Sequence, residues 1–94
     1  MMQKVYAKNP DIVFRQIADE AILVPVKNKV RDLESIYTLN PVAARIWELI
    51  DGVRKTDEIR DIIVNEFEVS TEGAEKDLGE FLETLSGTGG IKEV

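Results

Sequence analysis

The chain has 94 residues, of which 44% are hydrophobic and 32% are charged, and its formal net charge is −6. This length suits one small domain with enough apolar residues for a core, and no apolar run approaches the ~20 residues that a membrane span needs. Because cysteine and histidine are absent, disulfides, thiolate chemistry, imidazole base catalysis and most zinc or iron–sulfur sites are excluded, so we expect no cofactor, no metal and no enzyme activity.

Three short β-strands are predicted first, joined by links short enough for an antiparallel meander. They cover residues 12–18, 20–26 and 33–39, where β-branched and aromatic residues are frequent. Pro25 places the end of the second strand at a sheet edge or a bulge. In the third strand Glu34 is the only charge that would blunt an edge, and proline and lysine are both absent. An open edge is therefore expected there.

The first helix is predicted over residues 41–51, directly after the third strand. Asn40 has the side chain of a strong N-cap, and Pro41 fits the first helical position, where a missing N–H costs nothing. Gly52 is expected at the left-handed C′ position that ends the helix. Asp51 opposes the helix dipole, and either a hydrogen bond to the turn around Gly52 or a contact elsewhere would explain its position.

Two further helices follow, each with an apolar stripe at helical spacing. The second has Thr56 as its expected N-cap and a stripe of Ile59, Ile62, Ile63 and Phe67. The third has Ser70 as its expected N-cap, ends in a turn at 86–90, and carries a stripe of Ala74, Leu78, Phe81, Leu82 and Leu85. Trp47 is expected in the core or at its rim. Residues 91–94 either add a short strand or fray.

A β-meander followed by three helices predicts a single α+β domain over residues 1–94, with a winged-helix-like helical part. DNA binding would then be one candidate function. However, residues 42–94 carry six basic and thirteen acidic groups, and residues 70–86 have a net charge of −4. An acidic recognition helix would repel DNA, so nucleic acid is not an expected partner. The initial residues lack the apolar core of a signal peptide, which favours a cytoplasmic location and no membrane partner.

The order of several residues is similar to that of the PqqD-like family. Upstream, Phe14-Arg-Gln-Ile and Ala21-Ile-Leu-Val-Pro resemble the first hairpin of the family. The similarity covers about residues 10–86, and its remaining elements are Leu39-Asn40, Ala43-Ala44, Ile46-Trp47, Leu49, Asp51-Gly52, Glu58-Ile59, Ile62, Phe67-Glu-Val-Ser, Ala74, Asp77, Phe81-Leu82 and Leu85.

This resemblance implies a three-stranded antiparallel sheet packed on three helices, acting as a RiPP recognition element. Such a stand-alone peptide chaperone binds the leader segment of a ribosomally made precursor peptide. It presents the leader to a modifying enzyme, often a radical SAM protein. The resemblance further implies that the leader adds as a strand to the third strand, in a groove against the third helix. An open edge is physically suited to this mode, since main-chain bonds supply affinity and side-chain pockets supply specificity.

The expected contact residues lie on these two elements. On the third strand, the backbone is the main candidate, and on the third helix both the stripe and its polar rim are candidates: Ser35, Ile36, Tyr37, Thr38, Ala74, Lys76, Asp77, Leu78, Glu80 and Phe81. The apolar members also fit the core by periodicity, and the polar members also fit a solvated helix surface. The acidic helical half predicts a leader with some basic character.

A purely structural role is the remaining alternative. The open third strand could pair with a second copy of the chain, which would make the domain a dimerisation module rather than a peptide-binding one. Occupation of that edge by a partner copy would distinguish this homodimer from a peptide complex.

Overall fold

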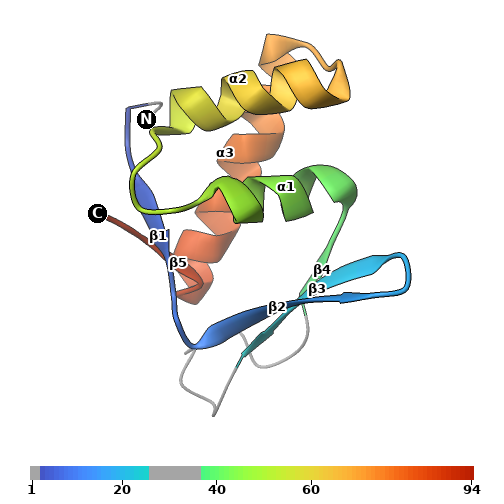
Figure 1. The fold of residues 1–94 in the computed structure, drawn as a ribbon. Coiled ribbons are helices and arrows are strands. Elements are labelled where there is room, and N and C mark those ends of the chain that lie inside the picture. Colours follow the sequence, from blue (N-terminus) through green and yellow to red (C-terminus); the bar gives the residue numbers. More distant parts are fainter. Residues whose placement is uncertain (1–2, 26–36) are drawn as a thin grey trace.

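A three-stranded antiparallel sheet and three helices form most of the computed structural model, which describes residues 3–25 and 37–94 (Figure 1). The predicted α+β architecture is therefore confirmed. In chain order the elements are β1 (Tyr6–Lys8), β2 (Ile12–Ile17), β3 (Glu20–Pro25), β4 (Tyr37–Leu39), α1 (Pro41–Leu49), α2 (Thr56–Phe67), α3 (Thr71–Thr88) and β5 (Ile91–Glu93).

The sheet has the order β2-β3-β4, so β3 is its central strand and β4 lies at one edge. Leu23 of β3 pairs with Phe14 on one side and with Tyr37 on the other. Buried Leu23 and its same-face neighbours Ala21 and Leu39 pack in the core. The first two strands match the predicted ranges closely. Of the predicted third strand, residues 33–36 lie outside the described residues.

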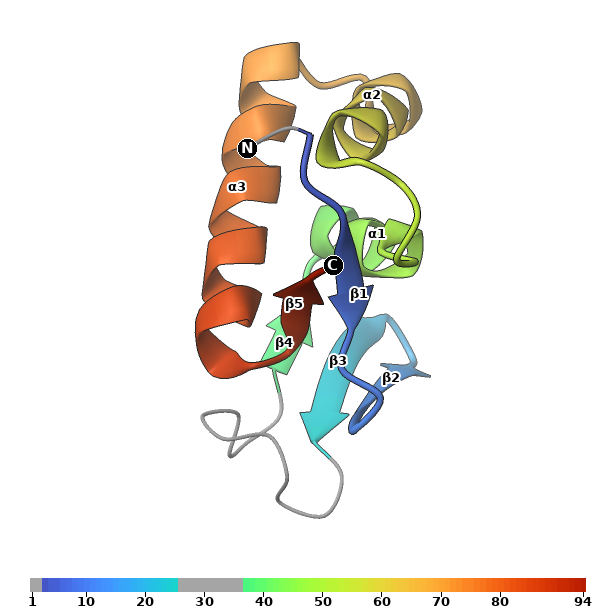
Figure 2. The ribbon, with the colours of Figure 1, turned by 90° about the vertical axis from the view of Figure 1, so that its left-hand side faces the viewer.

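A second, two-stranded sheet pairs β1 with β5, and neither the sheet nor β1 was expected from the sequence. It settles the alternative left open for residues 91–94 in favour of a strand. On the other side of β1, the Gly52 N–H donates to Tyr6 O, and just before the strand the Thr56 N–H donates to Lys4 O, both at 2.9 Å. Figure 2 shows β1 lying between β5 and the α1–α2 connection. Through β1, the N-terminal segment thus contacts both the α1–α2 connection and the C-terminal strand β5.

Capping confirms two of the three predicted helix starts. Asn40 Oδ1 accepts the Ala43 N–H at 2.8 Å, and Ser70 Oγ accepts the Gly73 N–H at 3.0 Å. The expectation of Thr56 as an N-cap is wrong by one residue, because Thr56 is the first residue of α2 and is only 1% exposed. Lys55 takes the N-cap position, where its N–H donates to the Glu58 carboxylate at 2.9 Å.

The end of α1 differs from the prediction. The helix stops at Leu49, because Ile50 turns to an extended conformation and becomes buried in the core. Gly52 does have a left-handed φ of 80°, but it lies in the turn after the helix rather than at the C′ position. Asp51 organises this turn, since its Oδ1 accepts the N–H groups of Val53 and Arg54 at 2.9 and 2.8 Å. The hydrogen-bonding explanation for Asp51 is thus confirmed.

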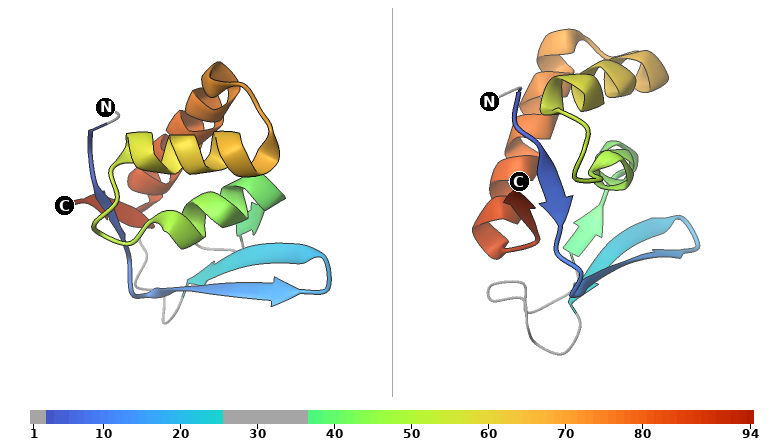
Figure 3. Two further views of the ribbon diagram at one scale, coloured as in Figure 1. Left: turned by 45° about the horizontal axis from the view of Figure 1, so that its top comes forward. Right: turned by 60° about the vertical axis from the view of Figure 1, so that its left-hand side comes forward.

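All three helices lie on one side of the sheet (Figure 3). The stripe of α3 is buried over its whole length, and Trp47 is 3% exposed, as predicted. The ammonium group of Lys8 lies 5.3 Å from the centroid of the Trp47 ring, which places β1 against α1. The third helix continues to Thr88, three residues into the predicted turn, and Gly89 ends it with a φ of 83°. In the described ranges, no helix is both long and apolar enough to cross a membrane.

Replacing Gly52 and Gly87 by alanine tests the backbone conformations assigned to them, which are left-handed at Gly52 and helical at Gly87. A Cβ at Gly52 would meet only the Ala7 side chain at 3.8 Å, so the penalty for Gly52→Ala comes from its left-handed φ and should be about 1–2 kcal/mol. A Cβ at Gly87 meets nothing within 4 Å, so Gly87→Ala in α3 should stabilise by about 0.5–1 kcal/mol. Urea unfolding of both variants measures the two effects. Equal stabilities would contradict the assigned backbone.

Two exposed carboxylates should make stability depend on pH. Backbone N–H groups of Arg54 and Val53 hold the pKa of Asp51 below its ordinary value of 3.8, and the Arg45 guanidinium holds the pKa of Glu66 below 4.5. Since both pKa values are lowered by folding, their stabilisation is complete above the ordinary values and disappears as the pH falls through the folded-state values.

Unfolding in urea from pH 7 to pH 3 tests this expectation. The free energy of unfolding should decrease below about pH 4.5. The double variant Asp51→Asn, Glu66→Gln should show a shallower decrease than the unmodified protein. Identical slopes for the double variant and the unmodified protein would be incompatible with these hydrogen bonds.

Candidate functional site

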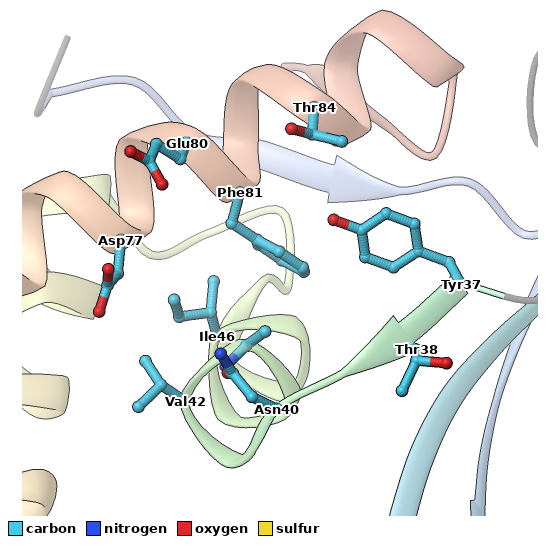
Figure 4. Close-up of a pocket in the computed structure, with 10 residues that line it drawn as sticks. Tyr37, Thr38, Asn40, Val42, Ile46, Asp77, Glu80, Phe81 and Thr84 are labelled. Carbon is cyan, nitrogen blue, oxygen red and sulfur yellow. The ribbon is translucent and has the colours of Figure 1, made fainter.

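A groove of about 240 Å³ lies between β4, α1 and α3 (Figure 4). Each element contributes a wall: β4 with the N-cap Asn40 that follows it, one face of α1, and the middle of α3. The lining residues are Tyr37, Thr38, Asn40, Val42, Ala43, Ile46, Asp77, Glu80, Phe81 and Thr84.

Local sequence explains why these side chains meet. Asn40 caps α1 directly after β4, so the strand and the start of the helix cannot separate. On α3, Asp77, Glu80, Phe81 and Thr84 follow the spacing of three, four and seven residues that places side chains on one helical face. That face turns toward β4 in Figure 4.

The groove has an apolar floor and a polar rim. Ile46 and Phe81 are buried and close the bottom, with half-buried Val42 beside them. The side chains of Thr38 and Asp77 are exposed, as are the other polar lining residues Asn40, Glu80 and Thr84. This arrangement leaves room for an apolar group below and for polar contacts above.

The free edge of β4 borders this groove. β4 pairs with β3 on one side, and among the described strands nothing pairs with its other side. In Figure 4 the groove lies between that side of β4 and α3. Unpaired backbone N–H and C=O groups at a sheet edge can accept an additional strand. The groove is therefore positioned to receive the side chains of such a strand.

The charged residues that the structure describes around the groove are all negative. Asp77 and Glu80 are the carboxylates in this lining, which among residues 3–25 and 37–94 contains no lysine or arginine. Elsewhere on the helices, carboxylates are paired with arginines: Glu66 with Arg45 at 2.8 Å and Glu75 with Arg60 at 3.2 Å. Within residues 3–25 and 37–94, neither groove carboxylate has a cationic partner. A cation bound in the groove would supply one.

The expected contact residues divide into four groups. Tyr37, Thr38, Asp77, Glu80 and Phe81 line the groove. Lys76 is exposed on α3 but is not part of the lining. Ala74 and Leu78 are each 1% exposed, so they hold α3 on the core and offer no surface to a ligand. Ser35 and Ile36 lie outside the described residues.

Five lining residues were not among the contact residues expected from the sequence: Asn40, Val42, Ala43, Ile46 and Thr84. The three on α1 share its apolar face, and periodicity cannot separate the floor of a groove from the interior of a core. Thr84 could have been found, because it lies three, four and seven residues after Phe81, Glu80 and Asp77.

A second hollow, of about 290 Å³, lies on the other side of α1. Gln16, Ala21 and Leu39 line it, and these three residues form one cross-strand row of the sheet. This hollow therefore lies over one face of the sheet. Arg45, the cation in the described lining of this hollow, already donates two hydrogen bonds to Glu66. The hollow lies over the face of the sheet and not along the edge of β4.

Metal binding was considered for both hollows. In the parts of the chain that the structure describes, no group of three or more carboxylates could hold a metal ion. What the first groove offers is an apolar floor, two carboxylates and a strand edge. Those features are suited to recognition of an extended chain.

Comparison with known proteins agrees with this arrangement. The family model "Coenzyme PQQ synthesis protein D (PqqD)" matches residues 20–91. Among solved structures, "TbiB1 in Complex with the TbiA(beta) Leader Peptide" is 27% identical, with a TM-score of 0.73 over 92% of this chain and 94% of that chain. "Lasso peptide synthetase B1 complexed with the leader peptide" shares the fold, with a TM-score of 0.75, 20% identity, and coverage of 93% and 96%.

A comparison with curated proteins found no match. The family model nevertheless spans the groove completely, from the central strand of the sheet to the start of β5. The order of elements, the fold and the matched residues lead to one conclusion. The chain belongs to the PqqD family.

Proposed function

We propose that this protein binds the leader segment of a ribosomally made precursor peptide, which adds as a strand to the edge of β4. The observation that carries this proposal is the edge of β4, which no described strand pairs, beside a groove with an apolar floor. The two similar solved structures support it, since both are described as complexes with leader peptides.

Strand addition assigns different tasks to backbone and side chains. Main-chain hydrogen bonds along Tyr37–Leu39 would give affinity with little dependence on sequence. Alternate side chains of the added strand would point toward α3, where Phe81 and Ile46 form the floor. Specificity would then come from the groove. Ala74 and Leu78 act indirectly, because they fix the position of α3 on the core.

The bound leader would be presented to a modifying enzyme. A radical SAM protein or another enzyme that modifies ribosomal peptides is the proposed partner, and this chain supplies binding rather than catalysis. Composition supports that division, because the sequence contains neither cysteine nor histidine for nucleophilic or general-base chemistry.

Peptide titration with NMR shift mapping is the direct test. The probes are synthetic peptides that cover the N-terminal segments of short peptides encoded beside this protein. We expect saturable amide shifts at Tyr37–Leu39 and at residues 77–84. Binding of none of these peptides, or shifts confined to the second hollow, would overturn the proposal.

A matched pair of variants locates the site independently. Thr84→Trp would fill the groove from its exposed rim and should weaken peptide binding at least tenfold. Ser86→Trp adds the same side chain to an exposed position of α3 outside the groove, and should leave affinity unchanged. Isothermal titration calorimetry measures both. Self-association that Thr84→Trp abolishes, without any peptide binding, would instead indicate a homodimer formed through β4.

A further inference from the structure

We infer that the groove selects peptides with a two-part pattern, in which a lysine or arginine lies two residues from an apolar residue. The apolar side chain occupies the floor, and the cation binds between Asp77 and Glu80. This inference rests on the proposed function, because it takes the ligand to be a strand added to β4.

The two ends of the groove differ chemically. Asp77 and Glu80 lie toward one end, where β4 leads into α1, and Tyr37 and Thr84 lie at the other end (Figure 4). Phe81 lies between the ends, above Ile46 in the same view. A ligand therefore meets an acidic end, an apolar centre and an uncharged polar end.

The length of the groove sets the spacing of the pattern. Asp77 and Thr84 are seven residues apart on α3, which corresponds to about 10 Å along the helix. An extended strand covers this length with about three residues. Because successive side chains of a strand point to opposite sides, two of those three can face α3. They are separated by one residue.

Charge determines which side chain occupies the acidic end. In the free protein, Asp77 and Glu80 are exposed and solvated. An added strand would cover part of this rim, and a carboxylate that loses water without gaining a partner costs free energy. A cation compensates this loss, whereas an acidic residue would add repulsion. The groove thus rejects acidic segments as well as favouring basic ones.

Selection from a library of random 12-residue peptides, displayed on phage and captured by the immobilised protein, tests the pattern. The selected peptides should be enriched in a lysine or arginine two positions from an apolar residue, in either order. Selection against Asp77→Asn, Glu80→Gln should retain the apolar preference and lose the cationic one.

The matched control is Glu72→Gln, Glu83→Gln. It removes two exposed carboxylates from the same helix, outside the groove, so the net charge changes equally. This variant should keep the cationic preference. For one selected peptide, replacing its cation by glutamine should weaken binding to the unmodified protein and to the control about three- to tenfold. The same replacement should change binding to Asp77→Asn, Glu80→Gln less than twofold.

The result separates this inference from the proposed function. Peptides that Thr84→Trp fails to capture, but that show no cationic preference, would overturn the inference and leave strand addition at the groove intact. An equal loss of preference in the control and in the groove variant would also overturn it, because a general charge effect would then be responsible. Selection of no peptide that depends on Thr84 would overturn both.

Discussion

The continuous passage from β4 into α1 is the constraint on which the rest of the structure depends. Asn40 accepts the Ala43 N–H at 2.8 Å, and Pro41 begins the helix without requiring a partner for an N–H. Because no flexible residue separates strand from helix, the edge of β4 keeps a fixed position relative to the apolar face of α1. A binding site made of a strand edge and two helices needs this rigidity, since an extra residue at the junction would turn Val42 and Ile46 away from the groove.

The same side chains serve folding and recognition where α3 meets this junction. Phe81 belongs to the buried stripe of α3, yet its ring also lines the groove, whereas Ala74 and Leu78 are wholly enclosed. Polar positions on the same face, Asp77 and Thr84, stay exposed. Substitutions at the rim can thus change which peptide is recognised with little loss of folding stability, because exposed substitutions change stability little. Changes to the floor would remove buried contacts and act on folding and binding together.

Local signals predicted most of the fold, and long-range pairing accounts for the main omissions. Asn40, Ser70 and the stripe of α3 are recognisable because caps and helical periodicity act within a few residues. β1 was missed because it is stabilised by residues about 85 positions away in β5 and by the α1–α2 connection. The early end of α1 has a similar cause, since burial of Ile50 in the core outweighs continuation of the helix. At the site, apolar spacing marked Phe81, Ala74 and Leu78 alike as expected contact residues, although of these three only Phe81 lines the described groove. The spacing cannot separate them, since the depth of burial depends on neighbours from other elements.

The size of the groove limits how a ligand can gain affinity. Its volume of about 240 Å³ is below the 300–1,000 Å³ that is usual for small-molecule pockets, and one large side chain would fill most of it. A flexible peptide also loses conformational entropy when it is ordered into a strand. Backbone pairing along β4 must therefore supply much of the binding free energy, and one apolar contact cannot distinguish many sequences. Discrimination then depends on the rim, where Asp77 and Glu80 are the charged residues within the described lining. A narrow apolar groove and an acidic rim without a cationic partner among the described residues together favour selection by sequence pattern rather than by bulk hydrophobicity.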